Sequence, residues 1–228
     1  PWWKITAIIL LLYAVVGGLL LPVPEKPLLG ETIRNLYYHV CMWFAMMILF
    51  TTSAIHAIKY LRNGELLHDN KSKSYAAVGS FLGILGYSTG AIWATYTWAD
   101  PNYPAYASFG SIMREPKLIG AAIALLIYAA YFILRGSISD MDKRARVSAV
   151  YNIFAFAMLF PSIWIIPRLK PSLHPGQEGN PALNFNDIDA RMRMVFYPAV
   201  LGWTLLGFWI ANLRIRYNIL LDKKMEKS

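Results

Sequence analysis

The chain has 228 residues, of which 57% are hydrophobic, and its mean hydropathy is +0.39. Soluble domains are only about 45–50% apolar, and six separate apolar runs of membrane-spanning length exclude a soluble globular fold. The formal net charge of +9 would suit nucleic-acid binding, but in a membrane protein it indicates basic cytoplasmic loops.

The apolar runs predict an all-α polytopic membrane protein, with one integral membrane domain over residues 1–228 and six transmembrane helices. In chain order these helices are expected at about 3–21, 36–60, 75–98, 118–134, 147–166 and 194–213. Glycines recur in the third run at spacings of four, three and four, so they line one helix face (Gly79, Gly83, Gly86 and Gly90). Such a face lets another helix approach closely. Pro161 is expected to kink the end of the fifth helix.

The distribution of basic residues predicts the orientation of the chain. Fourteen of the 22 Lys and Arg residues lie at the N-terminus, in the second and fourth linkers and in the C-terminal tail. The other eight lie in the remaining loops. Cytoplasmic segments carry the excess of Lys and Arg, so both termini are predicted to be cytoplasmic. The aromatic, proline-broken loop after the third run then faces outward, where it forms either a flat apolar surface or an ordinary interfacial aromatic belt.

Two histidines reach this outer side in the predicted topology: His39 at the start of the second run, and His174 in the last outer loop. Histidine can hold haem iron axially, so two histidines from distant segments can take both axial positions. Arg34 and Lys117 also face outward and are predicted to pair with the haem propionates, unless they only anchor helix ends. The flat face of haem suits the outward aromatic residues Trp93, Trp98, Tyr103, Tyr106 and Phe109.

The other two histidines are not expected to join this site. His68 falls in a cytoplasmic linker and is expected to be solvated. His56 lies 17 residues after His39, about 26 Å along the helix, and is expected to bond a neighbouring helix. The chain has no Gly-rich phosphate loop, no nucleophile–histidine–acid arrangement and no His-Glu metal pair, and its only cysteine is Cys41. No enzymatic activity is therefore predicted.

Several segments of the chain resemble the cytochrome c maturation protein C family, also called the haem exporter protein C family. The matching segments are RNLYYHVCMWFA (34–45), TGAIWATYTW (89–98), PKL (116–118), DKRARVSAVYNI (142–153) and SLHP (172–175). They occur in the family's order across nearly the whole chain, with the family's six-helix plan.

The resemblance implies haem transport for cytochrome c-type biogenesis in the bacterial inner membrane. It implies that haem b is held transiently on the outer face between His39 and His174, against a tryptophan-rich (WWD) segment. Arg34 and Lys117 match positions that the family fills with basic residues. The implied partners are a membrane-tethered haem chaperone, the subunits of an ATP-binding-cassette complex and a small single-helix protein.

The sequence departs from the family in the WWD segment. The aligned run, SFGSIMREPKL (108–118), keeps Lys117 and an acidic residue, Glu115, but lacks the clustered tryptophans. Cys41 stands where proline is usual. Either the tyrosines and Phe109 supply the flat surface instead, or the affinity for haem is altered or lost.

Two other functions stay open from the residues alone. A membrane b-type electron carrier would normally place histidine pairs at both faces, whereas only one outer pair is available here. A haem-free structural or permease-like subunit would fit the depleted tryptophans and the glycine face. The basic linker with Arg144 and Arg146 is interpreted either as a docking surface for an ATPase complex or as ordinary positive-inside charge.

Overall fold

The computed structural model describes residues 1–26, 29–98, 108–165, 168–169 and 188–225. Its elements in chain order are α1 (Trp2–Leu20), η1 (Gly30–Asn35), α2 (Leu36–Asn63), α3 (Leu66–Thr97), α4 (Phe109–Ile112), α5 (Pro116–Gly136), α6 (Met141–Leu159), η3 (Phe160–Ile165) and α7 (Ala190–Met225). Every regular element within these ranges is helical, and six helical spans are long and apolar enough to cross a membrane. The predicted all-α membrane fold with six transmembrane helices is confirmed.

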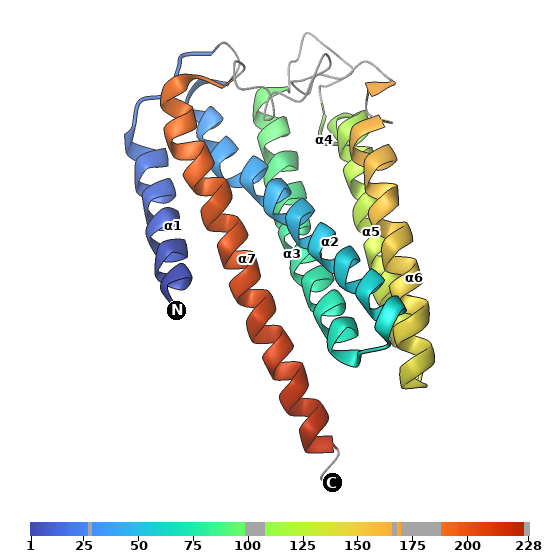
Figure 1. Ribbon diagram of the computed structural model, residues 1–228. Helices are drawn as coiled ribbons and strands as arrows, with labels where there is room; N and C mark the ends of the chain where they lie inside the picture. Colours follow the sequence, from blue (N-terminus) through green and yellow to red (C-terminus); the bar gives the residue numbers. More distant parts are fainter. Residues whose placement is uncertain (27–28, 99–107, 166–167, 170–187, 226–228) are drawn as a thin grey trace.

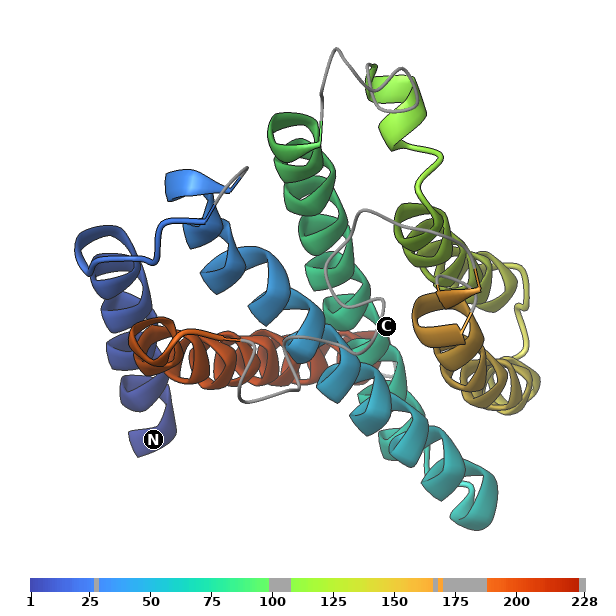
Figure 2. The same ribbon diagram turned by 90° about the horizontal axis from the view of Figure 1, so that it is seen from above.

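The helices alternate in direction, so that both chain termini lie at one end of the bundle (Figure 1). The connections from α2 to α3 and from α5 to α6 lie at that same end, which we call the lower end. The opposite, upper end carries η1, α4 and the beginning of α7. Seen from above, α1 lies on one side, α5 and α6 lie on the other, and α2 and α3 lie between them (Figure 2). Helix α7 begins beside α1 and runs beneath α2 toward α3. Which membrane face the upper end meets stays a prediction from the charge distribution.

The glycine face of α3 packs directly against α2. Its four glycines meet, in order along the helix, the side chains of Phe50, Met46, Trp43 and His39. A Cβ added at Gly79 would lie 2.9 Å from the Phe50 ring, and one added at Gly86 would lie 3.0 Å from the Trp43 indole nitrogen. Real Cβ atoms rarely or never come so close, so the glycines permit the close approach of the two helices, as predicted.

The fifth predicted helix changes its geometry near Pro161. The α-helix α6 ends at Leu159, and the chain continues through a wider π-type turn, η3. Proline has no N–H to donate to the preceding turn, and its ring crowds the carbonyl four residues earlier. A local π-type turn accommodates such a break, and it carries the chain to the upper end of the bundle.

Two helices extend well beyond the apolar runs that predicted them. Helix α3 begins at Leu66, whereas the apolar run begins at Tyr75, and α7 continues to Met225 through the basic tail. The first turns of α3 are polar, yet the side chains of Asp69 and Asn70 are buried against other helices. Hydropathy alone does not predict a polar helical turn, because its side chains are buried through hydrogen bonds to residues distant in sequence.

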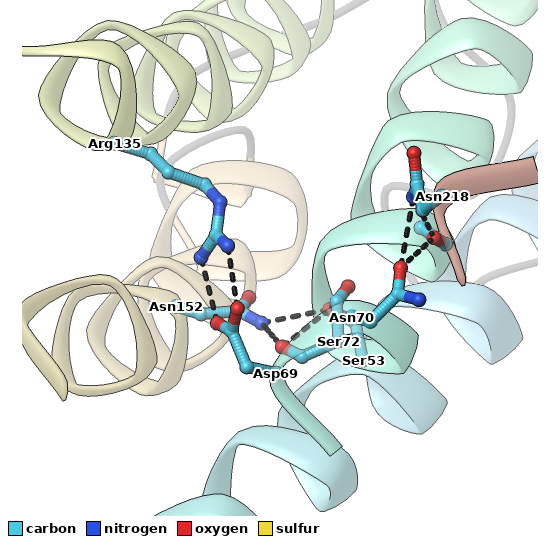
Figure 3. A network of polar contacts seen from close by, with 8 residues as sticks. Ser53, Asp69, Asn70, Ser72, Arg135, Asn152 and Asn218 are labelled. Atoms are coloured by element: carbon cyan, nitrogen blue, oxygen red, sulfur yellow. Dashed lines mark hydrogen bonds and ion pairs between the residues drawn. The ribbon is translucent and has the colours of Figure 1, made fainter. Parts of the chain in front are cut away.

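A buried ion pair joins two helices at the lower end (Figure 3). The Arg135 guanidinium, in the last turn of α5, donates two hydrogen bonds to the Asp69 carboxylate of α3, at 2.7 and 2.5 Å. Both side chains are about 90% buried. The bidentate geometry satisfies both charges and fixes the lower end of α5 on α3.

Neutral polar side chains extend this connection to three further helices, α2, α6 and α7. The Asn152 amide of α6 donates to the hydroxyls of Ser53 in α2 and Ser72 in α3, both at 2.7 Å. The Asn218 amide of α7 donates to the Asn70 side-chain oxygen at 2.8 Å. Interhelical hydrogen bonds of this kind hold membrane helices together, so five helices are tied at the lower end.

The lower histidines also pair with each other. The Nδ1 atoms of His56 and His68 lie 2.9 Å apart, and the His68 Nε2 lies 3.6 Å from the Glu65 carboxylate. The prediction that His56 bonds a neighbouring helix is confirmed. The prediction that His68 is solvated in a linker is wrong: the residue lies inside α3, and its side chain is 15% exposed.

Candidate functional site

A cavity of about 590 Å³ opens at the upper end of the bundle. Its walls come from α2, α3, α5, η3 and the region where α7 begins, and most of the lining side chains are apolar. The lining on α2 runs from Leu36 to Met47, about 16 Å along the helix. A largely apolar cavity of this size, with a few convergent polar groups, is typical of a small-molecule site.

His39 is the imidazole that lines this cavity among the described residues. It is the fourth residue of α2, and its Nδ1 lies 2.7 Å from the carbonyl oxygen of Gly86 in α3. A carbonyl only accepts, so Nδ1 must carry the proton and donate, which leaves the lone pair on Nε2. Histidines that bind metals show the same arrangement, because the second nitrogen donates to a carbonyl or carboxylate and orients the ring.

The top of the glycine face makes room for this imidazole. A side chain on Gly90 would collide with the His39 ring, since its Cβ would fall closer to the ring than real Cβ atoms come. The rings of Trp43 and Trp93 meet His39 edge-on, at centroid distances of 6.3 and 6.1 Å. The ring is therefore held by α2, α3 and the carbonyl of Gly86 together.

The cavity collects part of the predicted aromatic surface. Trp93 and Trp98 line it, as do Trp43 and Trp164, which the sequence reasoning had not selected. Phe109 lies in α4, is 61% exposed and does not line the cavity. Tyr103 and Tyr106 fall outside the residues that the structure describes.

One of the two missed tryptophans carried a signal in the sequence. Trp43 follows His39 by four residues on a predicted helix, and residues at that spacing share a helix face. Trp164 carried no such signal, because its position depends on the π-type turn η3.

The two predicted propionate partners lie in different places. Lys117, in the first turn of α5, lines the cavity. Arg34 does not: its NH1 donates to the carbonyl oxygens of Gly18 and Leu21, each at 2.7 Å, and its Nε pairs with Glu31 at 2.6 Å. These carbonyls belong to the carboxyl end of α1, where a cation satisfies groups that the helix leaves unpaired. The structure thus shows Arg34 in the helix-anchoring arrangement.

Other charged side chains also line the cavity. Lys26 and Arg168 add two cations, and Asp189 adds a carboxylate. The backbone N–H of Arg191 donates to Asp189 at 2.9 Å and holds the pKa of that carboxyl below its ordinary value, and the Arg191 side chain pairs with it at 3.3 Å. The carboxylate is thus already paired, which leaves the charged part of the lining predominantly cationic.

The second predicted haem ligand, His174, lies outside the described part of the chain. The residues on either side of its segment do belong to the site, because Arg168 and Ile188 both line the cavity. His174 follows Arg168 by only six residues. Six residues of extended chain reach at most about 20 Å, so His174 must lie within that distance of Arg168.

The described part of the cavity lacks the ligands that a bare metal ion needs. Over the described residues, no group of three or more His, Cys, Asp or Glu side chains is placed to hold one. One imidazole among the described lining residues, with apolar walls and cations beside it, suits a ligand that brings most of its own metal coordination. A flat, apolar, carboxylate-bearing metal complex has these properties.

Comparison with known protein families gives a match over the whole chain. Residues 1–228 match the family described as heme exporter protein C.

Proposed function

Because the chain belongs to the haem exporter protein C family, a component of haem transport in cytochrome c biogenesis, we propose that its upper cavity holds haem for delivery. In this proposal His39 and His174 are the axial ligands, and the haem passes to a membrane-tethered chaperone. The observation that carries the proposal is that His39 lines a largely apolar cavity while its Nδ1 is engaged by Gly86. That contact leaves Nε2 as the nitrogen available to iron.

The walls of the cavity fit the chemistry of haem as a cargo. Apolar residues and the indoles of Trp43, Trp93, Trp98 and Trp164 suit the porphyrin ring. The cations Lys117, Lys26 and Arg168 suit its two carboxylates. Trp43 and Trp164, which the sequence analysis does not predict, can supply the flat surface that the WWD segment of this chain lacks.

The shallow position of His39 fits a protein that must release what it binds. The residue lies in the first turn of α2, at the upper end of the bundle. The other proposed ligand, His174, belongs to a segment that the sequence predicts to be an outer loop. Haem bound there needs no passage through a packed core in order to leave. We therefore propose transient binding of haem b and not a permanent prosthetic group.

The wider setting of the proposal follows the family. It places the protein in the bacterial inner membrane with both termini cytoplasmic, next to an ATP-binding-cassette complex and a small single-helix protein. The Arg144 and Arg146 segment at the lower end keeps both its interpretations, docking surface or positive-inside charge. The proposal includes no enzymatic step.

The competing functions receive less support from the structure. The lower histidine pair, His56 and His68, bonds directly through Nδ1 atoms 2.9 Å apart, so the two rings do not flank a space for a second haem. This contact counts against an electron carrier with haems at both faces. A haem-free scaffold has no evident need of an indole-lined cavity with an oriented histidine.

The test is an absorption spectrum of the purified protein, with and without added haem. We expect a Soret band of b-type haem that weakens strongly in His39→Ala and in His174→Ala. His56→Ala is the matched control, because its histidine lies at the lower end and does not line the cavity. Equal haem content in all four proteins would overturn the proposal, and so would the absence of any Soret band in the wild type.

A further inference from the structure

We propose that Arg168, together with Lys117, forms the carboxylate-binding part of this cavity, and that Arg34 does not. The inference rests on the proposed haem-binding function and names the residues that would recognise the propionates. Three observations carry it: the position of Arg168, its proximity to Lys117, and the separate engagement of Arg34.

Arg168 is held at the cavity by Trp164. Its NH1 donates to the Trp164 carbonyl oxygen at 2.8 Å, and its guanidinium carbon lies 5.2 Å from the centre of the Trp164 ring. Both residues line the cavity. A guanidinium that is oriented by a carbonyl and an aromatic face loses less freedom when it binds a further partner. The planar fork has five N–H donors, and this carbonyl contact uses one NH1 group.

Lys117 lines the same cavity from the first turn of α5. Its ammonium group is close enough to the Arg168 guanidinium for the two charges to interact unfavourably. The Glu115 carboxylate, which accepts a hydrogen bond from the Lys117 backbone N–H, also interacts favourably with the ammonium group. A ligand carboxylate that enters the cavity would meet both the Lys117 ammonium and the Arg168 guanidinium. The one carboxylate in the described lining, Asp189, is already paired with Arg191.

The ligand that best fits this pair of cations is an apolar molecule with carboxylate groups on one edge. Arginine binds carboxylates in a bidentate manner, and lysine adds a point charge. Arg34 is a poorer candidate, because its hydrogen bonds go to the carboxyl end of α1 and to Glu31. The sequence predicts Arg34 as a propionate partner, and the fold instead brings Arg168 to the cavity.

The test compares haem with its dimethyl ester, in which both propionate carboxylates are blocked. Binding of each compound to purified protein is followed through the Soret band. Loss of a hydrogen bond to a charged group weakens binding about tenfold or more. We therefore expect Arg168→Gln and Lys117→Gln each to weaken haem binding about tenfold, and to leave ester binding unchanged. We expect Arg168→Lys to fall between Arg168→Gln and the wild type.

Arg114→Gln is the matched control, because Arg114 is an exposed arginine at the upper end that does not line the cavity. Wild-type affinity of Arg168→Gln for haem would overturn the inference. Equal losses of haem and ester binding in Arg168→Gln would also overturn it, since they would assign Arg168 a packing role on Trp164. If the wild type bound neither compound, the proposed function itself would fail, and the two failures are therefore distinguishable.

Discussion

The Nδ1 of His39 lies 2.7 Å from the backbone carbonyl oxygen of Gly86, and this one contact links helix packing to the chemistry of the cavity. The carbonyl orients the imidazole and assigns its proton. The contact exists only because α3 approaches α2 along a face of glycines. The same residues thus serve membrane-helix association and the orientation of the His39 imidazole.

The first prediction concerns Gly90, which leaves space for the His39 ring. In Gly90→Ala the new methyl group collides with the imidazole, and overpacking of this kind costs about 1–3 kcal/mol. We expect the ring to be displaced and haem affinity to fall at least tenfold, while the helices still form. A Soret titration measures the affinity, and far-UV circular dichroism reports the folding.

Gly136→Ala is the control for this substitution, because a Cβ at Gly136 meets no atom within 4 Å. We expect it to leave haem affinity unchanged. If Gly90→Ala bound haem as tightly as Gly136→Ala does, the imidazole would not need the position that the structure gives it.

The second prediction separates the tryptophans of the cavity from the aromatic residues selected by sequence. Trp43 lines the cavity, whereas Phe109 is 61% exposed on α4 and does not. We expect Trp43→Ala to weaken haem binding about tenfold, because an aromatic contact and its buried area are lost. We expect Phe109→Ala to have no effect. The same Soret titration measures both variants. A larger loss of haem affinity in Phe109→Ala than in Trp43→Ala would show that the haem contacts the segment around Phe109 and not the cavity wall at Trp43.

Arg34, which precedes α2, and Lys117, in the first turn of α5, show which part of the site the sequence does not predict. Their outward positions in the sequence predict the same role for Arg34 and Lys117. Only the fold distinguishes them, because the Arg34 guanidinium donates to carbonyl groups at the end of α1. Hydropathy locates helices, but it does not report which carbonyls at a helix end need a partner.

The same limit applies to Asp69 and Trp164. Asp69 belongs to a polar stretch that reads as a linker, yet Arg135, 66 residues later, makes it part of a buried helix. Trp164 reaches the cavity through a π-type turn around Pro161. Such placements depend on contacts distant in sequence. By contrast, the glycine spacing and the position of His39 are local patterns, and they were predictable.

The third prediction concerns Arg34 as an anchor of α1. Arg34→Gln removes two charge-assisted hydrogen bonds to the Gly18 and Leu21 carbonyls, each worth about 1.5–3 kcal/mol. We expect faster hydrogen–deuterium exchange around the end of α1, with little change in haem affinity. Exchange mass spectrometry checks the first point and a Soret titration the second. A selective loss of haem binding, with the dimethyl ester bound normally, would instead make Arg34 a propionate partner.

The fourth prediction concerns the buried pair of Asp69 and Arg135 at the lower end. Asp69→Asn leaves the Arg135 guanidinium buried without a counter-charge, a change that typically costs 3–5 kcal/mol. We expect a large fall in the thermal unfolding midpoint in detergent. The double variant Asp69→Leu, Arg135→Met should recover much of it, because it removes both charges together. Glu31→Gln, which breaks a pair whose carboxylate is 77% exposed, should cost at most about 1 kcal/mol. Equal midpoints for Asp69→Asn and Glu31→Gln would show that the buried pair does not hold α5 on α3.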